Sequence, residues 1–181
     1  MSSDELQELQ EHAEHAKDDP SLAPVSLTMA ILAVLVAVVS LLGHRAHTEE
    51  VILQAQASDQ WAYYQAKNIR GHEDKIFAGL TAIATSSKPE ELAKMREEFL
   101  QEADRYKDDQ NEIQGEARKL EQEVVTERKR ADRYDLGEVF LEIGLVVTSI
   151  TLLSGRRMFW YLGLLMGVVG LAVAVTGFLV H

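Results

Sequence analysis

The chain of 181 residues contains no cysteine, only three prolines and few aromatic residues, which make up 7% of the sequence. Without cysteine, disulfides, thiolate metal sites and a cysteine nucleophile are excluded, whereas the redox compartment stays open. The phosphate-loop pattern G-x-x-x-x-G-K-[ST] and the patterns G-x-G-x-x-G and G-x-S-x-G are also missing. Because long helices without concave clefts make poor catalysts, we expect a protein that is not an enzyme and that binds no cofactor.

Positive charge is scarce as well. Eighteen Lys and Arg residues stand against 29 Asp and Glu, for a net charge of -11, which argues against a nucleic-acid partner. Hydrophobic residues amount to 46%, too many for a disordered chain. The apolar and charged residues are sorted into separate blocks, and residues 1–21 form an acidic N-terminal segment. A water-soluble globular enzyme does not sort its residues in this way.

Three blocks are almost purely apolar and cover residues 22–43, 136–154 and 158–180. The length of each block is close to the ~20 residues that a helix needs to cross a bilayer core. The acidic segment before the first block differs from the basic start of a signal peptide, so we expect this block to remain as a membrane helix. Only residues 155–157 separate the last two blocks, which favours a tight helical pair. We therefore predict an all-α membrane protein with three transmembrane helices.

The charged stretch between the first and second blocks, residues 44–136, has the spacing of a coiled coil. Alternating steps of three and four residues connect a sustained downstream seam. Its positions are 92, 95, 99, 102, 106, 110, 113, 117, 120, 124, 127, 131 and 134. A weaker upstream register contains Ile52, Ala55, Ala62, Ala66, Ile69, Ile76, Leu80 and Ile83, and it is interrupted by Asp59 and Glu73.

A turn is expected at residues 86–88. Ser86 and Ser87 suit a helix cap, Pro89 suits a first helical turn, and Glu90 and Glu91 complement the positive end of a helix dipole. The two flanking helices would be roughly 63 Å and 72 Å long. Because their lengths are similar and the turn is short, we predict that they fold into a long antiparallel helical hairpin, which is a coiled coil.

The segment "DPSLAPVSLTMAILAVLVAVVSLLGHRAHTEE", followed by "ASDQWAYYQAKNIR", resembles the bacterial domain-of-unknown-function (DUF) family 4337. The resemblance covers nearly the whole chain, from the acidic segment to the last apolar block. It implies a small bacterial multi-pass membrane protein. It supplies no activity, no catalytic residue and no ligand.

Two histidine pairs have a spacing that places both rings on one helical face. They are His12 with His15, and His44 with His47. With a neighbouring glutamate such a pair can bind zinc, but the spacing is common by chance and no H-E-x-x-H pattern is present. Solvated or membrane-interface histidines are the simpler interpretation, and we predict no metal site.

Two acidic residues fall within the second apolar block. Glu138 lies near its start, and Glu142 lies about one turn deeper. Ionisable groups inside a membrane are costly and favour a functional hypothesis, such as a proton or cation site. The competing interpretation is a hydrogen bond between helices, to Ser40, to Thr148 or to a neighbouring subunit.

Small residues predict close helix packing in the first and third blocks. Gly163, Gly167 and Gly170 form one such face, and Ala30, Ala33 and Ala37 form another. Such faces serve contacts within one chain or between copies. An aromatic cluster of Trp61, Tyr63 and Tyr64 is read as coiled-coil packing, with a partner surface as the alternative.

These patterns favour a non-enzymatic, membrane-anchored helical assembly or scaffold protein that is a homo-oligomer in the lipid bilayer. The alternative is a small ion-conducting or transport-accessory protein that uses Glu142. The basic residues give conflicting topology signals. Arg156 and Arg157 in a short loop favour the cytoplasmic side, whereas the opposite face carries a cluster of Arg128, Lys129, Arg130 and Arg133. We favour a cytoplasmic coiled coil in the inner membrane of a bacterial cell, with the N-terminus outside.

Overall fold

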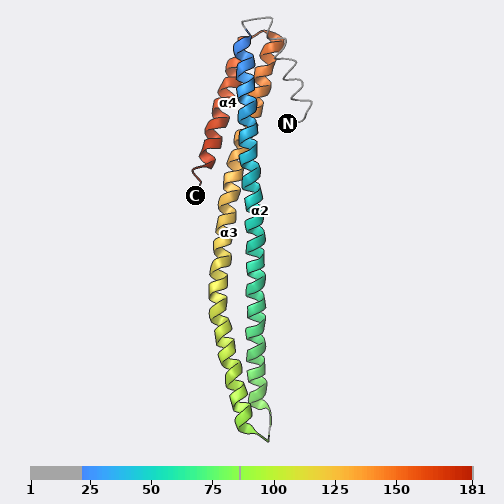
Figure 1. Cartoon of the computed structure of the whole chain (residues 1–181), viewed down its shortest axis with the longest axis vertical. Helices are drawn as coiled ribbons and strands as arrows, with labels where there is room; N and C mark the ends of the chain where they lie inside the picture. The colour runs from blue at the N-terminus through green and yellow to red at the C-terminus, as the bar shows by residue number, and fades with distance from the viewer. Residues whose placement is uncertain (1–21, 86, 181) are drawn as a thin grey trace. The chain divides into compact units, whose positions relative to one another are not determined.

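The computed structural model describes residues 22–85 and 87–180, in which all regular secondary structure is helical (Figure 1). The described helices are α2 (Ala23–Ile83), α3 (Pro89–Ser154) and α4 (Arg157–Gly177). Each contains a stretch that is long and apolar enough to cross a membrane. The acidic segment of residues 1–21, with His12 and His15, lies outside the described residues, as does Ser86 of the expected turn.

The start of α3 follows from its local sequence. Pro89 is the first helical residue, where its missing N–H costs no hydrogen bond. Glu90 and Glu91 lie in the first turn, where a carboxylate complements the positive end of the helix dipole. Lys88 adds an ion pair of 2.9 Å to Glu91. This position for the helix start agrees with the sequence pattern around Pro89.

Packing divides the chain into two units. Within the described residues, the first unit consists of residues 22–48 and 126–180, and the second consists of residues 49–125. The first unit contains the beginning of α2, the end of α3 and all of α4. The second contains the remaining parts of α2 and α3.

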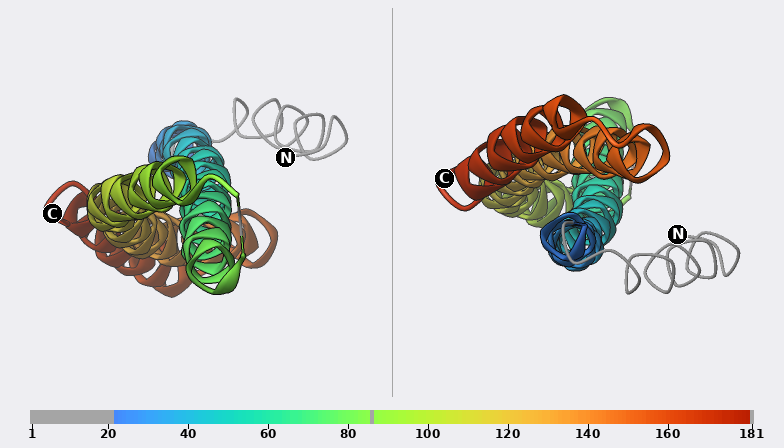
Figure 2. Two further views of the ribbon diagram at one scale, coloured as in Figure 1. Left: turned by 90° about the horizontal axis from the view of Figure 1, so that it is seen from below. Right: turned by 90° about the horizontal axis from the view of Figure 1, so that it is seen from above.

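In the first unit, three helical segments surround a small apolar core. The right view of Figure 2 shows these segments end-on. The side of α2 that enters this core carries large apolar residues at steps of three and four. The core cluster consists of Leu32, Val36, Val39, Ala46, Ala131, Tyr134, Leu141 and Ala174. Leu141 of α3 is completely buried. On the α4 side, the Leu32 side chain of α2 fills the space that Gly167 leaves.

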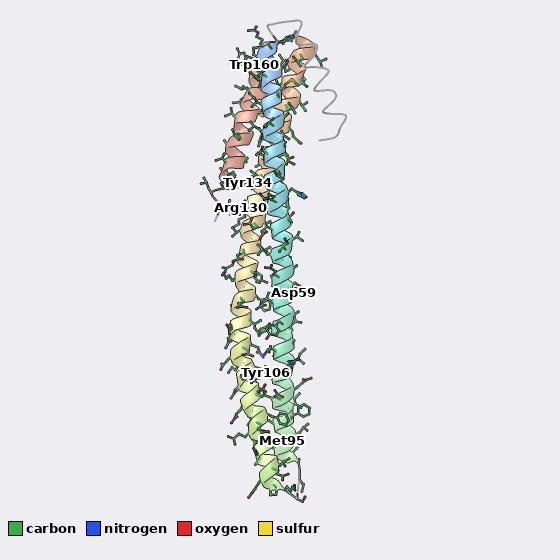
Figure 3. All side chains as sticks on the ribbon, in the orientation of Figure 1. Asp59, Met95, Tyr106, Arg130, Tyr134 and Trp160 are labelled. Atoms are coloured by element: carbon green, nitrogen blue, oxygen red, sulfur yellow. The ribbon has the colours of Figure 1, made fainter. Side chains whose placement is uncertain are left out.

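In the second unit, α2 and α3 contact each other along their length and run in opposite directions. The Trp61 indole N–H donates to the Glu121 carboxylate at 2.9 Å, and the Phe77 and Phe99 rings stack with centroids 5.5 Å apart. The residue numbers of the partners therefore decrease along α3 as those of α2 increase, which is the pattern of an antiparallel pair. Figure 3 shows Tyr106 on the side of α3 that faces α2.

The downstream seam agrees with the structure, because all its positions except Met95 are buried or half-buried. The prediction that the upstream register packs against α3 is wrong. Every one of its residues is exposed, including Asp59 and Glu73. We call these ten residues, the eight of the upstream register with Asp59 and Glu73, the outer stripe.

Small and polar residues, rather than large apolar ones, form the side of α2 that faces α3. Ala57, Gly71 and Ala78 are buried there, and Gln60 and Lys67 bridge to acidic residues of α3. Small residues leave room for the larger side chains of α3, such as Tyr106. The large apolar residues of this part of α2 therefore lie on the face opposite to the one that contacts α3.

Candidate functional site

The glycine face of α4 is a site of close helix packing in the first unit. Gly163, Gly167 and Gly170 are all buried. A Cβ atom at Gly170 would lie 2.7 Å from the Gly137 carbonyl oxygen, and one at Gly163 would overlap the Thr148 hydroxyl. Gly163 and Gly170 therefore allow the backbones of α3 and α4 to approach closely, whereas a Cβ atom at Gly167 would meet the Leu32 side chain of α2.

The α3 side of this contact also depends on glycine. A Cβ at Gly137 would lie 2.8 Å from the Ala174 Cβ, and one at Gly144 would lie 2.8 Å from the Gly163 carbonyl oxygen. Neither residue is among the positions predicted from the sequence. Their spacing of seven residues on the second apolar block is the signal that could have found them.

Polar contacts hold the two ends of α4. Near its start, the Trp160 indole N–H donates to the Thr28 hydroxyl of α2 at 3.1 Å. Just beyond its end, the Arg130 guanidinium of α3 donates to the Val180 carbonyl at 3.2 Å. Trp160 and Arg130 are labelled in Figure 3. The two hydrogen bonds fix α4 along its length against the rest of the first unit.

The alanine face of α2 is located differently from the glycine face. Ala30 and Ala37 are exposed and Ala33 is half-buried. The buried side of this segment is formed instead by larger residues, such as Leu32 and Val36. Ala30 and Ala37 thus lie on the outer surface of the first unit.

The two carboxylates of the second apolar block differ in environment. Glu142 is exposed on the outer surface of the first unit, and Glu138 is half-buried. Neither has a hydrogen-bond or salt-bridge partner among the described residues. The Thr148 hydroxyl donates to the Gly144 carbonyl at 2.7 Å, rather than to Glu142. The Glu142 carboxylate therefore projects outward from an otherwise apolar surface.

Of the two histidine pairs, His44 and His47 lie within the described residues, and they do not form part of a group of metal ligands there. His44 and His47 are both exposed, and the His47 Nε2 lies 2.9 Å from the Asp135 carboxylate of α3. No group of three or more potential metal ligands occurs in the residues that the structure describes. The His47 ring is therefore placed for a hydrogen bond with Asp135, which becomes an ion pair when the imidazole is protonated.

In the second unit, Lys67 contacts one carboxylate and two tyrosine rings. The Lys67 ammonium donates to the Asp109 carboxylate at 2.8 Å and lies 4.9 Å from the Tyr106 ring centroid and 5.6 Å from that of Tyr63. The hydrogen bond to Asp109 raises the pKa of Lys67 above its usual 10.5. Trp61 packs edge-on against Tyr64 at 5.5 Å, whereas Tyr63 is exposed. These contacts position α2 and α3 against each other.

Comparison with known proteins adds one finding. The model of DUF4337, a domain of unknown function, matches residues 21–180. The chain belongs to this family. No curated protein and no solved structure matches it.

The DUF4337 chain also has a shallow, open hollow of about 490 Å³ on α2 of the second unit. It is lined by Gln65, Asn68, Ile69, His72, Glu73 and Ile76. All six residues come from α2 alone, so the hollow is open to its surroundings on the side away from this helix.

Proposed function

We propose that this DUF4337 chain is a non-enzymatic, membrane-anchored helical scaffold protein that assembles into homo-oligomers. Residues 22–43, 136–154 and 158–180 would cross the inner membrane of a bacterial cell. Residues 44–136 would form an antiparallel coiled-coil hairpin outside the bilayer. Its partners would be the lipid bilayer and further copies of the same chain.

The observation that carries this proposal is the outer surface of the first unit. Large apolar side chains are exposed there, among them Leu27 and Val34 at 63% and Val146 at 61%. In water such a surface is an aggregation liability. In a bilayer it is favourable, because helices satisfy their own backbone hydrogen bonds.

The coiled-coil part of the proposal is supported by the pairing in the second unit. The contacts of Trp61 with Glu121 and of Phe77 with Phe99 lie at different levels of one antiparallel pair. Alternating steps of three and four residues connect the buried positions of α3, as in a heptad seam. A rigid helical pair of this kind provides length and side-chain surface for assembly.

Two experiments test anchoring and assembly. The chain should remain in the membrane pellet after alkaline carbonate extraction, which releases proteins that are bound only at the surface. In a mild detergent its mass, measured by light scattering, should be a multiple of 20.2 kDa. Release by carbonate would contradict anchoring, and a monodisperse monomer would contradict the homo-oligomer.

The proposed orientation places the hairpin in the cytoplasm. The basic cluster that precedes the second span supports it, since each cation near an anionic leaflet contributes about 1 kcal/mol. Because the chain has no cysteine, Ser87→Cys creates a unique thiol. In intact cells this thiol should resist an impermeant maleimide and react after permeabilisation. Prompt labelling in intact cells would reverse the topology.

A second function, ion conduction or accessory transport, is favoured by the outward position of Glu142. A carboxylate on an apolar surface is costly unless another copy or an ion neutralises it. Ion flux into liposomes should then fall strongly in Glu142→Gln and remain in the matched control Glu138→Gln. Equal flux in the Glu142→Gln variant and the wild type would reject the transport function.

A further inference from the structure

The outer stripe is an apolar face on the unit of the chain that is otherwise most charged. Ile69 is 60% exposed, Ile76 is 59% exposed and Ile83 is 80% exposed. The ten stripe positions follow steps of three and four without a break from residue 52 to residue 83. Sustained for more than four heptads, this spacing is that of a coiled-coil seam.

The stripe lies on the side of α2 that faces away from α3. The buried residues on the α3 side of α2, among them Ala57, Gly71 and Ala78, occupy different heptad positions. α2 therefore has two seams, and the structure fills only the one against α3. The open hollow of the second unit lies on the unfilled side, where Ile69 and Ile76 line it.

The outer surface of α3 does not match the stripe. At the corresponding levels it presents exposed polar and charged residues, including Glu97, Asp104, Asn111 and Arg118. The isoleucines of the stripe would gain little by packing on these side chains. The stripe does match a second copy of itself, since each large residue then meets its equivalent and each alanine meets an alanine.

We propose that the outer stripe is a self-association surface, on which α2 of one copy packs in parallel and in register against α2 of a second copy. The parallel direction rests on the proposed function, because copies inserted alike in one membrane present α2 in the same direction. The interface is isologous, so the same residues contribute from both copies. It extends over about 48 Å of helix.

Charge at the stripe is consistent with this register. Asp59 and Glu73 would each face their equivalents, which costs stability, but Arg70 and His72 flank Glu73 on the two edges of the seam. In a parallel coiled coil the edge residue of one helix lies beside the core position of the other, so His72 of one copy approaches Glu73 of the next. Polar core positions of this kind fix register and direction at some cost in affinity.

Single-cysteine variants test the geometry, since the natural chain has no cysteine. Ile69→Cys and Ile76→Cys, each alone in the full-length protein in membranes, should form disulfide-linked dimers on mild oxidation. Lys75→Cys is the matched control, because Lys75 is exposed on a neighbouring position away from the stripe. The stripe variants should cross-link about tenfold faster than the control. Equal rates would overturn the inference.

Mixed samples distinguish other arrangements. If cross-links form only when the Ile52→Cys and Ile83→Cys variants are mixed, the two α2 helices pair antiparallel. If they form only when the Ile76→Cys and Leu100→Cys variants are mixed, α2 of one copy packs on α3 of the next. Either result would overturn parallel self-pairing.

Core substitutions provide a second measurement. Ile76→Glu should weaken dimer formation about tenfold, and Glu73→Ile should strengthen it, while Lys75→Glu should leave it unchanged. The mass in detergent separates the two proposals. An oligomer without stripe cross-links would reject this interface and keep the scaffold function, whereas a monomeric wild type would reject the scaffold function itself.

Discussion

Gly71 of α2 and Tyr106 of α3 approach so closely that a Cβ atom at Gly71 would lie 3.4 Å from the Cβ of Tyr106. This is the closest side-chain approach of Gly71 across the second unit, and it lies one turn from the hydrogen bond between Lys67 and Asp109. The separation of the two Cβ positions is near the range that a disulfide requires. The pair therefore provides a direct measure of the pairing of α2 with α3.

The double variant Gly71→Cys with Tyr106→Cys should form an intramolecular disulfide in high yield on mild oxidation. Ala66→Cys with Ile113→Cys is the control, because Ala66 is on the exposed side of α2 while Ile113 is buried. Gel mobility before and after reduction measures both. Cross-links found only between chains would mean that α2 and α3 pair with different copies.

The raised pKa of Lys67 predicts a dependence of stability on alkaline pH. Because the folded state holds the proton more tightly than the unfolded state, this group's stabilisation is complete below its usual pKa of 10.5. The stabilisation is lost as the pH rises through the higher folded-state value. The difference in melting temperature between wild type and Lys67→Met should therefore shrink above pH 10.5. A constant difference across that range would contradict the role of the Asp109 hydrogen bond.

Identical glycine-to-alanine substitutions should have opposite effects at two positions. At Gly170 the new Cβ would lie 2.7 Å from the Gly137 carbonyl oxygen, and overpacking of this kind costs about 1–3 kcal/mol. At Gly79 nothing lies within 4 Å, so alanine should stabilise the helix by up to about 1 kcal/mol. The free energy of unfolding of both variants is measured in detergent from the loss of helical circular dichroism on denaturation. A neutral Gly170→Ala would show that α3 and α4 are not in backbone contact.

The hydrogen bond from Trp160 to Thr28 should couple α4 to α2 in a double-mutant cycle. Trp160→Phe and Thr28→Val each remove one partner, and the double variant removes both. We expect a coupling free energy of about 0.5–1.5 kcal/mol, as for a neutral hydrogen bond. Unfolding followed by circular dichroism in detergent measures the stability of each variant. If the stability losses of the two single variants simply add up in the double variant, the contact is excluded.

Large apolar residues made much of this structure predictable from the sequence. The three apolar stretches, the helix start at Pro89 and the downstream seam all depend on strong local signals, namely long uncharged runs, proline and heptad spacing. The family match over residues 21–180 agrees with the resemblance seen in the segment that begins at Asp19.

The side of α2 that contacts α3 could not be predicted in the same way. Its buried members Ala57, Gly71 and Ala78 carry almost no hydrophobic signal, because they are small, and Gly71 leaves room for Tyr106. The isoleucines on the opposite side have the stronger signal but no partner within the described chain. Gly137 and Gly144 were missed for a related reason, since a glycine contributes to packing through the side chain that it lacks.

Gly155 has consequences for how the chain matures. It adopts a φ of +65°, and Gly155 and Arg156 alone connect α3 to α4. Any other residue would pay about 1–2 kcal/mol for that left-handed backbone. A connection this short makes the contacts between α3 and α4 near its turn local in sequence, and local contacts form early. During synthesis the last two helices can therefore pair as soon as both leave the ribosome, before α2 has completed its contacts with them.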